Sequence, residues 1–168
     1  MTRSESTPRM DFVQAGTGKE YMRRKRRVQK LESSGGVVYR FRDGKFDIAL
    51  CGRNYPPIWG LPKGTPESDE TQLGTALREV QEETGLEVEE QKFIDSIEYW
   101  FVRAQDGARC HKMVHFYLMT AVGGDMSLHD HEFDVVKWLP IDEALDSLTY
   151  ENEVKIVQKG ISLVEEKS

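Results

Sequence analysis

Residues 78–86, with the sequence REVQEETGL, contain three glutamates that a helix would stack on one face. Glu79, Glu82 and Glu83 have the spacing i, i+3 and i+4, at which helical side chains are neighbours. Like charges at this spacing repel each other, and each exposed pair destabilises a helix by about 0.2–0.5 kcal/mol. The segment therefore needs a partner of opposite charge, and its only basic residue is Arg78.

A helix is predicted from Glu70 to Glu83, because this segment has few helix breakers and ends just before Gly85, a typical residue after the last turn. Its apolar side chains form one stripe that can pack against a sheet, and the glutamates lie beside that stripe. The stripe consists of Leu73, Ala76, Leu77 and Val80.

Two interpretations of the glutamate face are equally supported by the spacing alone. A divalent cation over the three carboxylates would turn their repulsion into attraction, and Mg²⁺ and Mn²⁺ prefer such oxygen ligands. The alternative is a solvent-exposed acidic face. Faces of that kind usually carry lysines four residues away, and this segment has none.

The chain on both sides of this helix alternates between strand and helix patterns, which predicts an α/β fold with a mixed sheet covered by helices. Asp43-Gly44 is a typical hairpin turn between the first two strands. The predicted strands are residues 33–41, 43–53, 93–102, 111–122 and 133–140, and the predicted closing helices are residues 141–148 and 151–166.

Basic residues are concentrated at the N-terminus. Residues 1–30 contain nine Lys or Arg and three acids, a net charge of +6, so residues 31–168 carry −12 in a chain of net charge −6. The run RRKRR suits the phosphates of nucleic acid. The absence of interleaved aromatics favours instead a solvated, partly ordered tail or a short surface helix, ahead of one domain at residues 31–168.

A reducing, cytoplasmic environment is expected, with no membrane partner. The sequence has no apolar run near the roughly 20 residues of a membrane span and no apolar stretch of signal-peptide type at its start. Cys51 and Cys110 do not make a disulfide framework, and neither belongs to a CxxC pair.

Read as one unit, residues 64–86 (GTPESDETQLGTALREVQEETGL) resemble the Nudix box, G-x5-E-x7-R-E-U-x-E-E-x-G-U, where U is a bulky apolar residue. The lead-in WGLPKG (59–64) and the segment HEFDVVKWLP (131–140) agree with this resemblance, which covers about residues 32–160. It implies an α/β/α sandwich with a mixed central sheet. The matching positions are Gly64, Glu70, Arg78, Glu79, Val80, Glu82, Glu83, Gly85 and Leu86.

The resemblance to the Nudix family implies an enzyme that hydrolyses a pyrophosphate bond, in a nucleoside diphosphate linked to another moiety, with Mg²⁺ or Mn²⁺. It implies that Glu79, Glu82 and Glu83 are metal ligands, together with the backbone carbonyl of Gly64. Glu70 and Arg78 match positions that orient these ligands. Arg suits that role because its planar fork can hold two carboxylates at once.

The general base stays open at this point. Glu82 or Glu83 could accept the proton of the attacking water directly. In several branches of the family a glutamate from a later loop does so, and Glu132 is placed for that role. The alternative is that Glu132 is a surface acid or an additional metal ligand. The motif HDH at residues 129–131 has no third soft ligand nearby, which favours a polar loop over a metal pair.

Several residues are candidates for holding the substrate. Lys63, Arg53 and Lys112 could contact its phosphates. Aromatic residues could stack on a base, although core packing is the favoured explanation for each of them considered alone. They are Trp59, Tyr99, Trp100 and Phe116.

The substrate itself is less constrained than the reaction, because specificity depends on variable loops. WGLPKG and KMVHFYL both resemble dinucleoside polyphosphate hydrolases, which predicts a diadenosine tetraphosphate-like substrate. An oxidised guanine nucleoside triphosphate and the 5′ end of RNA are the alternatives. No proline lies between Pro66 and Pro140, so the proline that marks many ADP-ribose pyrophosphatases is missing. The oligomeric state, monomer or homodimer, stays open.

Overall fold

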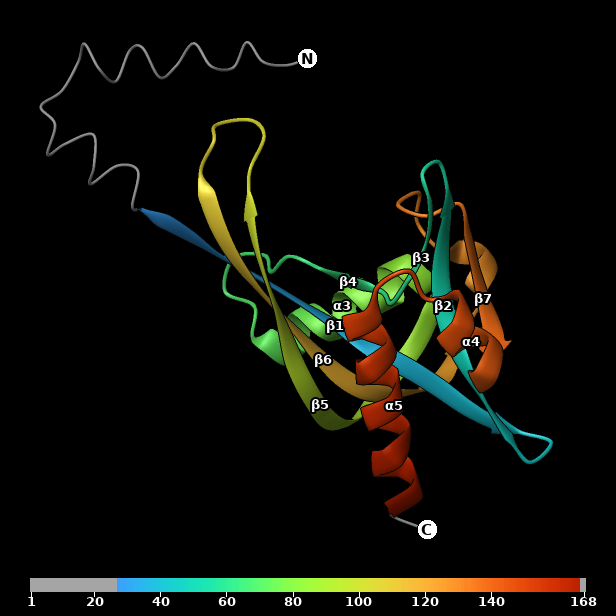
Figure 1. The fold of residues 1–168 in the computed structure, drawn as a ribbon. Helices are drawn as coiled ribbons and strands as arrows, with labels where there is room; N and C mark the ends of the chain where they lie inside the picture. The colour runs from blue at the N-terminus through green and yellow to red at the C-terminus, as the bar shows by residue number, and fades with distance from the viewer. Residues whose placement is uncertain (1–26, 167–168) are drawn as a thin grey trace, which may run out of the picture. The chain divides into compact units, whose positions relative to one another are not determined.

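The computed structural model describes residues 27–166 (Figure 1), so most of the tail predicted at residues 1–30 lies outside the described part. Val28 to Lys30 already belong to the first strand. The described strands are β1 (Val28–Arg42), β2 (Lys45–Asn54), β3 (Pro57–Gly60), β4 (Lys63–Gly64), β5 (Leu86–Val102), β6 (Arg109–Gly124) and β7 (Val135–Pro140). The described helices are α3 (Gln72–Thr84), α4 (Ile141–Ser147), α5 (Glu151–Glu166) and the 3₁₀ helix η2 (Met126–Leu128).

The chain divides into two compact units. Of the described residues, the smaller contains residues 27–31 and Tyr99–Lys112, and the larger contains Glu32–Glu98 and residues 113–166. Within residues 27–166, no helix is long and apolar enough to cross a membrane.

The smaller unit includes a hairpin tip between β5 and β6. The Arg103 N–H donates to the Ala108 carbonyl at 2.8 Å, which closes the turn. The Arg103 guanidinium pairs with Asp106 at 2.9 Å. The Trp100 ring stacks on His111 with 4.3 Å between the ring centroids.

The larger unit is built on a sheet in the order β3-β2-β1-β6-β5, with β4 pairing β1 and β7 pairing β2. The predicted hairpin of β1 and β2 is confirmed, and Arg42 pairs with Lys45 across its turn. Asp43 and Gly44 have φ values of 54° and 77°, the left-handed backbone that this tight turn requires. The short strands β3 and β4 are not indicated by the sequence pattern.

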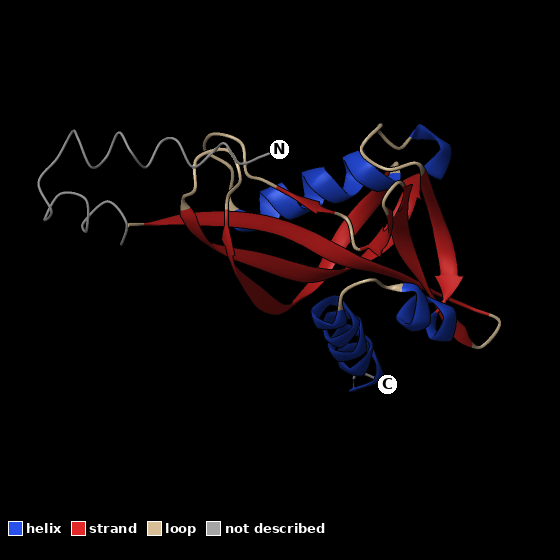
Figure 2. Ribbon diagram, turned by 45° about the horizontal axis from the view of Figure 1, so that its top comes forward, coloured by secondary structure: helices blue, strands red, loops and turns tan. Residues whose placement is uncertain are grey.

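Helices cover both faces of this sheet, which confirms the predicted mixed α/β fold (Figure 2). On one face, Ala76 and Val80 of α3 pack with Val38 and Met119. A Cβ atom built on Gly36 would lie 2.8 Å from the Met119 sulfur and 3.1 Å from a Val80 methyl carbon of α3, so this glycine lets the helix approach the sheet. On the other face, Gly160 of α5 packs against Ile94 and Leu118.

Helix α3 begins two residues later than predicted. Thr71 is its N-cap, with extended backbone, and the Thr71 hydroxyl accepts the Gly74 N–H at 2.9 Å. Glu70 therefore precedes the helix instead of opening it. The predicted end is confirmed at Gly85, whose φ of 77° suits a left-handed cap.

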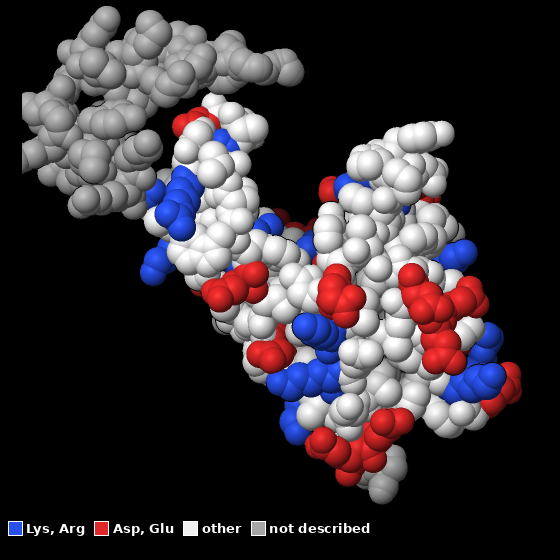
Figure 3. Space-filling view, viewed as in Figure 1, with Lys and Arg blue, Asp and Glu red and all other residues white. Residues whose placement is uncertain are grey.

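Acidic side chains gather over α4 and at the C-terminal end of α5 (Figure 3). Asp142 and Glu143 lie in the first turn of α4, where the helix dipole favours negative charge. Part of the negative charge of residues 31–168 therefore lies on this face of the larger unit.

Candidate active site

The site lies where β4 runs beside β1 and under α3. Ser34 pairs with Gly64, and Gly35 pairs with Lys63, so the two residues of β4 are fixed against the sheet. Glu79 and Glu83 reach this strand from the helix above. The structure thus brings residues 63–64 and two of the three box glutamates together.

Gly64 leaves room for the carboxylate of Glu79. A Cβ atom built on Gly64 would overlap the Glu79 carboxylate, so any side chain larger than hydrogen would displace it. Burial raises the pKa of Glu79 above its usual value, as does the charge of Glu82, whereas Arg78 opposes the rise. A cation beside Glu79 would stabilise its ionised form.

Glu83 is the most enclosed of the three glutamates, with 5% of its surface exposed. Its Oε1 accepts the main-chain N–H of Lys63 at 3.1 Å. Burial raises the pKa of Glu83 to about 8, the Lys63 N–H opposes the rise, and the charge of Glu79 adds to it. A buried carboxylate with so few compensating donors is a natural position for a bound cation.

Arg78 ties the glutamate face to the loop before the helix. Its Nε donates to Glu70 Oε2 at 2.6 Å, and its Nη2 donates to Glu70 Oε1 at 3.0 Å and to the Thr65 carbonyl at 2.9 Å. Its Nη1 lies 3.2 Å from a carboxylate oxygen of both Glu79 and Glu82. The bond from Arg78 lowers the pKa of Glu70 to about 2, so this carboxylate stays ionised as an anchor.

The loop after η2 adds an acid, Asp130, that lies outside the box motif. The Asp130 N–H donates to the Glu82 carbonyl at 2.9 Å, which attaches this loop to α3. The charge of Asp130 also raises the pKa of both Glu79 and Glu83. Asp130 is the central residue of the HDH motif. The two histidines of this motif suggest soft metal ligands, and the pattern gives no separate indication of a role for the aspartate.

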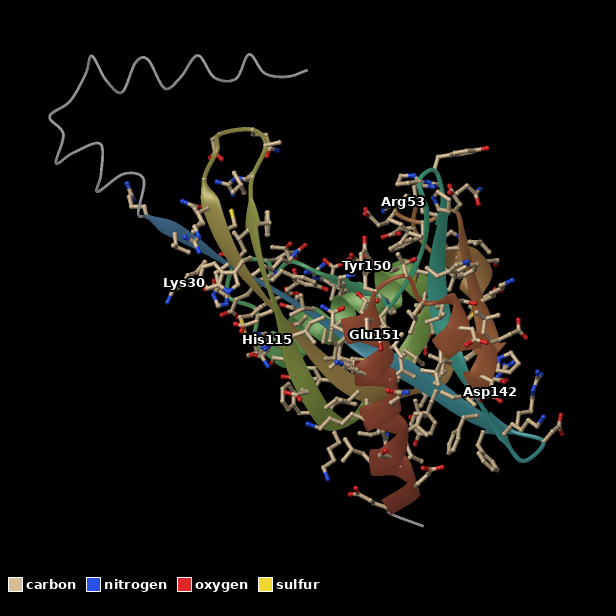
Figure 4. The ribbon with its side chains drawn as sticks, viewed as in Figure 1. Lys30, Arg53, His115, Asp142, Tyr150 and Glu151 are labelled. Carbon is tan, nitrogen blue, oxygen red and sulfur yellow. The ribbon has the colours of Figure 1, made fainter. Side chains whose placement is uncertain are left out.

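Arg53 and Glu132 contact each other. Arg53 Nη2 donates to the Glu132 carbonyl at 3.2 Å and to its Oε2 at 3.1 Å. The Arg53 guanidinium also lies 4.9 Å from the Phe133 ring centroid, and Figure 4 shows Arg53 near the end of β2. The predicted phosphate contact of Arg53 and the predicted catalytic role of Glu132 stay predictions, and each would require this ion pair to open or to be shared.

Lys63 and Trp59 lie on the segment that leads into the box. The Lys63 ammonium is 3.3 Å from Glu153 Oε2. The Trp59 ring packs over Gly52, and Lys137 Nζ lies 5.3 Å from the ring centroid. The predicted substrate contacts of Lys63 and Trp59 stay predictions.

The remaining candidates lie in the core or in the smaller unit. Phe116 has no exposed surface, so it belongs to the core and not to a stacking site. Lys112, Tyr99 and Trp100 belong to the smaller unit, and their substrate contacts stay predictions. His115, labelled in Figure 4, is not one of these candidates: it lies on β6 in the larger unit, and its two ring nitrogens bond to the Ser96 hydroxyl and to Glu32.

The donor set fits Mg²⁺ or Mn²⁺, which prefer carboxylate and carbonyl oxygens. Within residues 27–166, no three acidic, histidine or cysteine side chains already converge as a metal-binding group. The contacts of Arg78 account for this on α3, because its Nη1 draws Glu79 and Glu82 to the guanidinium. A cation bound on this face of α3 would compete with Arg78 for the carboxylates of Glu79 and Glu82, which repel each other when no positive charge is nearby.

The chain is similar to known proteins over most of its length. The NUDIX domain family model matches residues 31–159. The putative mutator protein MutT4 of Mycobacterium tuberculosis is 41% identical over 139 residues, covering 79% of this chain and 55% of the relative. The 8-oxo-(d)GTP phosphatase of Mycolicibacterium smegmatis is 31% identical over 115 residues, covering 68% of this chain and 34% of the relative.

Solved structures share the fold. The Caenorhabditis elegans Ap4A hydrolase in a binary complex superimposes with a TM-score of 0.65 at 21% identity, covering 81% of this chain and 98% of that chain. This chain therefore spans about half or less of the two curated relatives and nearly all of the solved one.

Proposed function

The chain belongs to the NUDIX family, and we propose that it is a hydrolase that uses a divalent cation to cleave a pyrophosphate bond in a nucleotide substrate. The observation that carries the proposal is the arrangement of Glu79 and Glu83 against β4. Both carboxylates are held beside residues 63–64, and burial raises the pKa of each. In such a site the ionised carboxylates are unfavourable by themselves, and a bound cation would stabilise them.

We assign the cation to the oxygens of Glu79, Glu82, Glu83 and the Gly64 carbonyl. The bound cation would supply positive charge to the substrate phosphates and make attack by water easier at neutral pH. Without it, the acidic face would repel a polyanionic substrate. The family resemblance of the box supports this ligand set, and the contact between Gly64 and Glu79 agrees with it.

Arg78 and Glu70 act as positioning residues in this proposal. Four groups anchor Glu70: the Nε and Nη2 of Arg78, the Thr75 hydroxyl and the Glu67 N–H. The anchored carboxylate fixes the guanidinium, whose Nη1 then orients Glu79 and Glu82. Electrostatic catalysis depends on this kind of fixed geometry.

We assign proton acceptance from the attacking water to Glu82. Half of its side chain is exposed, so it can reach water, whereas Glu83 is almost enclosed. Asp130 is the second candidate, because its main chain is bonded to Glu82 and its charge acts on the other two box glutamates. Glu132 ranks after both because it is paired with Arg53.

Two substrate classes follow from different observations. The name of one curated relative, the 8-oxo-(d)GTP phosphatase of Mycolicibacterium smegmatis, supports an oxidised guanine nucleoside triphosphate. The motifs WGLPKG and KMVHFYL support a dinucleoside polyphosphate of the diadenosine tetraphosphate type. Both would be cleaved by the same attack on a phosphorus of the polyphosphate chain, so the proposed reaction is common to them.

A substrate panel tests the proposal. Oxidised and normal nucleoside triphosphates, dinucleoside polyphosphates, ADP-ribose and 5′-triphosphorylated RNA would be compared by kcat/KM with Mg²⁺, with Mn²⁺ and with chelator. We expect cation-dependent cleavage of an oxidised nucleoside triphosphate, of a dinucleoside polyphosphate, or of both. If kcat/KM for a nucleoside triphosphate is about tenfold or more above that for every dinucleoside polyphosphate, a difference of about 1.4 kcal/mol, then a dinucleoside polyphosphate is excluded as the preferred substrate. The absence of pyrophosphate cleavage across the panel would refute the proposed function.

A further inference from the structure

Glu153, on the first turn of α5, is a buried acid that the proposed reaction does not use. Among residues 27–166 it is the only acid with no exposed surface. Its Oε1 accepts the Leu61 N–H at 2.9 Å. Its Oε2 has no hydrogen-bond partner and lies 3.3 Å from the Lys63 ammonium. Figure 4 labels Tyr150 and Glu151, which mark the start of this helix.

A buried carboxylate is costly unless it is paired, so Glu153 requires an explanation. Its location in the first turn of α5 is favourable for a negative charge. Its two oxygens, however, are directed at Leu61 and Lys63, which lie 92 and 90 positions earlier in the chain. The helix therefore places a fixed negative charge directly against the segment that leads into the box.

Lys63 connects this charge to the candidate cation site. Its main-chain N–H donates to Glu83 Oε1 at 3.1 Å, and its ammonium pairs with Glu153 Oε2. One residue therefore has two contacts with separate acids, one through the backbone and one through the side chain. A lysine beside a nearly enclosed carboxylate would otherwise neutralise it, because opposite charges attract strongly where water is excluded.

We propose that Glu153 is a positioning residue that holds the Lys63 ammonium at its own carboxylate, and so keeps Glu83 available to a divalent cation. The inference rests on the proposed function, since it requires a cation at Glu83. Once the charge of Glu153 is removed, Glu83 is the carboxylate that the Lys63 main-chain N–H already contacts and on which the Lys63 charge already acts. The ammonium then pairs with Glu83 and competes with the cation.

The test is a set of Mn²⁺ affinities measured by titration calorimetry, with free Mn²⁺ quantified by electron paramagnetic resonance. Glu153→Gln keeps an oxygen for the Leu61 N–H and removes the charge. We expect it to weaken Mn²⁺ binding by about tenfold or more, a loss that corresponds to one ion pair of modest strength. The double variant Glu153→Gln with Lys63→Met should restore the wild-type affinity to within about threefold.

Lys63→Met alone separates positioning from a merely structural role, and it remains informative if Glu153→Gln does not fold. If the ion pair only stiffens the segment, then breaking it from either side should weaken Mn²⁺ binding equally. In our proposal Lys63→Met binds Mn²⁺ at least as tightly as the wild type, because the competing ammonium is gone. A tenfold weakening in this variant, or wild-type affinity in Glu153→Gln, overturns the inference.

Two further variants serve as references. Lys159→Met breaks the exposed ion pair between Lys159 and Asp95 on the same helix, and we expect it to bind Mn²⁺ as the wild type does. Glu83→Gln should lose most of the Mn²⁺ affinity. If Glu83→Gln binds Mn²⁺ normally, the assigned cation site is wrong and the inference falls with it. If Glu83→Gln loses Mn²⁺ but Glu153→Gln does not, only the inference fails.

Discussion

Replacing Glu83 with glutamine should stabilise the cation-free protein at neutral and alkaline pH. Glu83 has 5% of its surface exposed, and burial raises its pKa from 4.5 to about 8. Between these pH values the folded protein holds a proton on Glu83 that the unfolded chain releases. The stabilising contribution of this proton is fully present below pH 4.5 and is lost as the pH rises through about 8.

The size of the effect follows from the same two values. The folded state carries one more proton than the unfolded state over a span of about 3.5 pH units, and each unit corresponds to about 1.36 kcal/mol. The wild type therefore loses up to about 5 kcal/mol of unfolding free energy between pH 4.5 and pH 8 through Glu83. A neutral glutamine cannot contribute to this loss.

The assay is urea unfolding of both proteins with chelator at several values between pH 5 and pH 9. The unfolding free energy of Glu83→Gln minus that of the wild type should rise with pH and flatten above about 8. Lys159→Met is the control, because it perturbs only Asp95, whose pKa Lys159 already holds below its usual value. A difference between Glu83→Gln and the wild type that stays constant over this range would refute the reasoning. Saturating Mg²⁺ should remove most of the expected pH-dependent difference in unfolding free energy.

Three further substitutions test the geometry of the site. Gly64→Ala should reduce kcat and Mn²⁺ affinity at least tenfold, because its methyl group would displace the Glu79 carboxylate; kinetics and calorimetry would check this. Arg78→Lys should lower kcat/KM at least tenfold with little change in the melting temperature, because lysine cannot reproduce the fork that holds three carboxylates. Asp130→Asn should lower kcat more than Glu132→Gln does, because Asp130 is attached to Glu82 whereas Glu132 is paired with Arg53. A larger loss of kcat in Glu132→Gln would show that Glu132 is the acid of this loop that takes part in the reaction.

Local features of the fold could be predicted from the sequence. The turn at Asp43-Gly44, the end of α3 at Gly85 and the end of β7 at Pro140 all depend on the backbone preferences of those residues. The start of α3 could not be placed, because Glu70 forms its bonds with Arg78 and Thr75 outside the helix. Strands β3 and β4 are too short to show any alternation of polar and apolar residues.

The candidate site was partly visible in the sequence. The three glutamates could be placed on one helix face because they are only four residues apart at most. The contact of Lys63 with Glu153 joins residues 90 positions apart, and a spacing rule cannot reveal it. Asp130 was missed because its importance comes from where its loop attaches to α3.

The central claim is that cleavage depends on a divalent cation held by the box glutamates, and kcat of Glu83→Gln tests it most directly. The variant and the wild type would be compared on the best substrate of the panel, in saturating Mg²⁺ and in chelator, after circular dichroism has confirmed that both are folded. We expect chelator to abolish wild-type turnover and Glu83→Gln to lower kcat by at least ~10²-fold, as for the loss of a principal electrostatic group. A folded Glu83→Gln variant with the wild-type kcat would contradict the account.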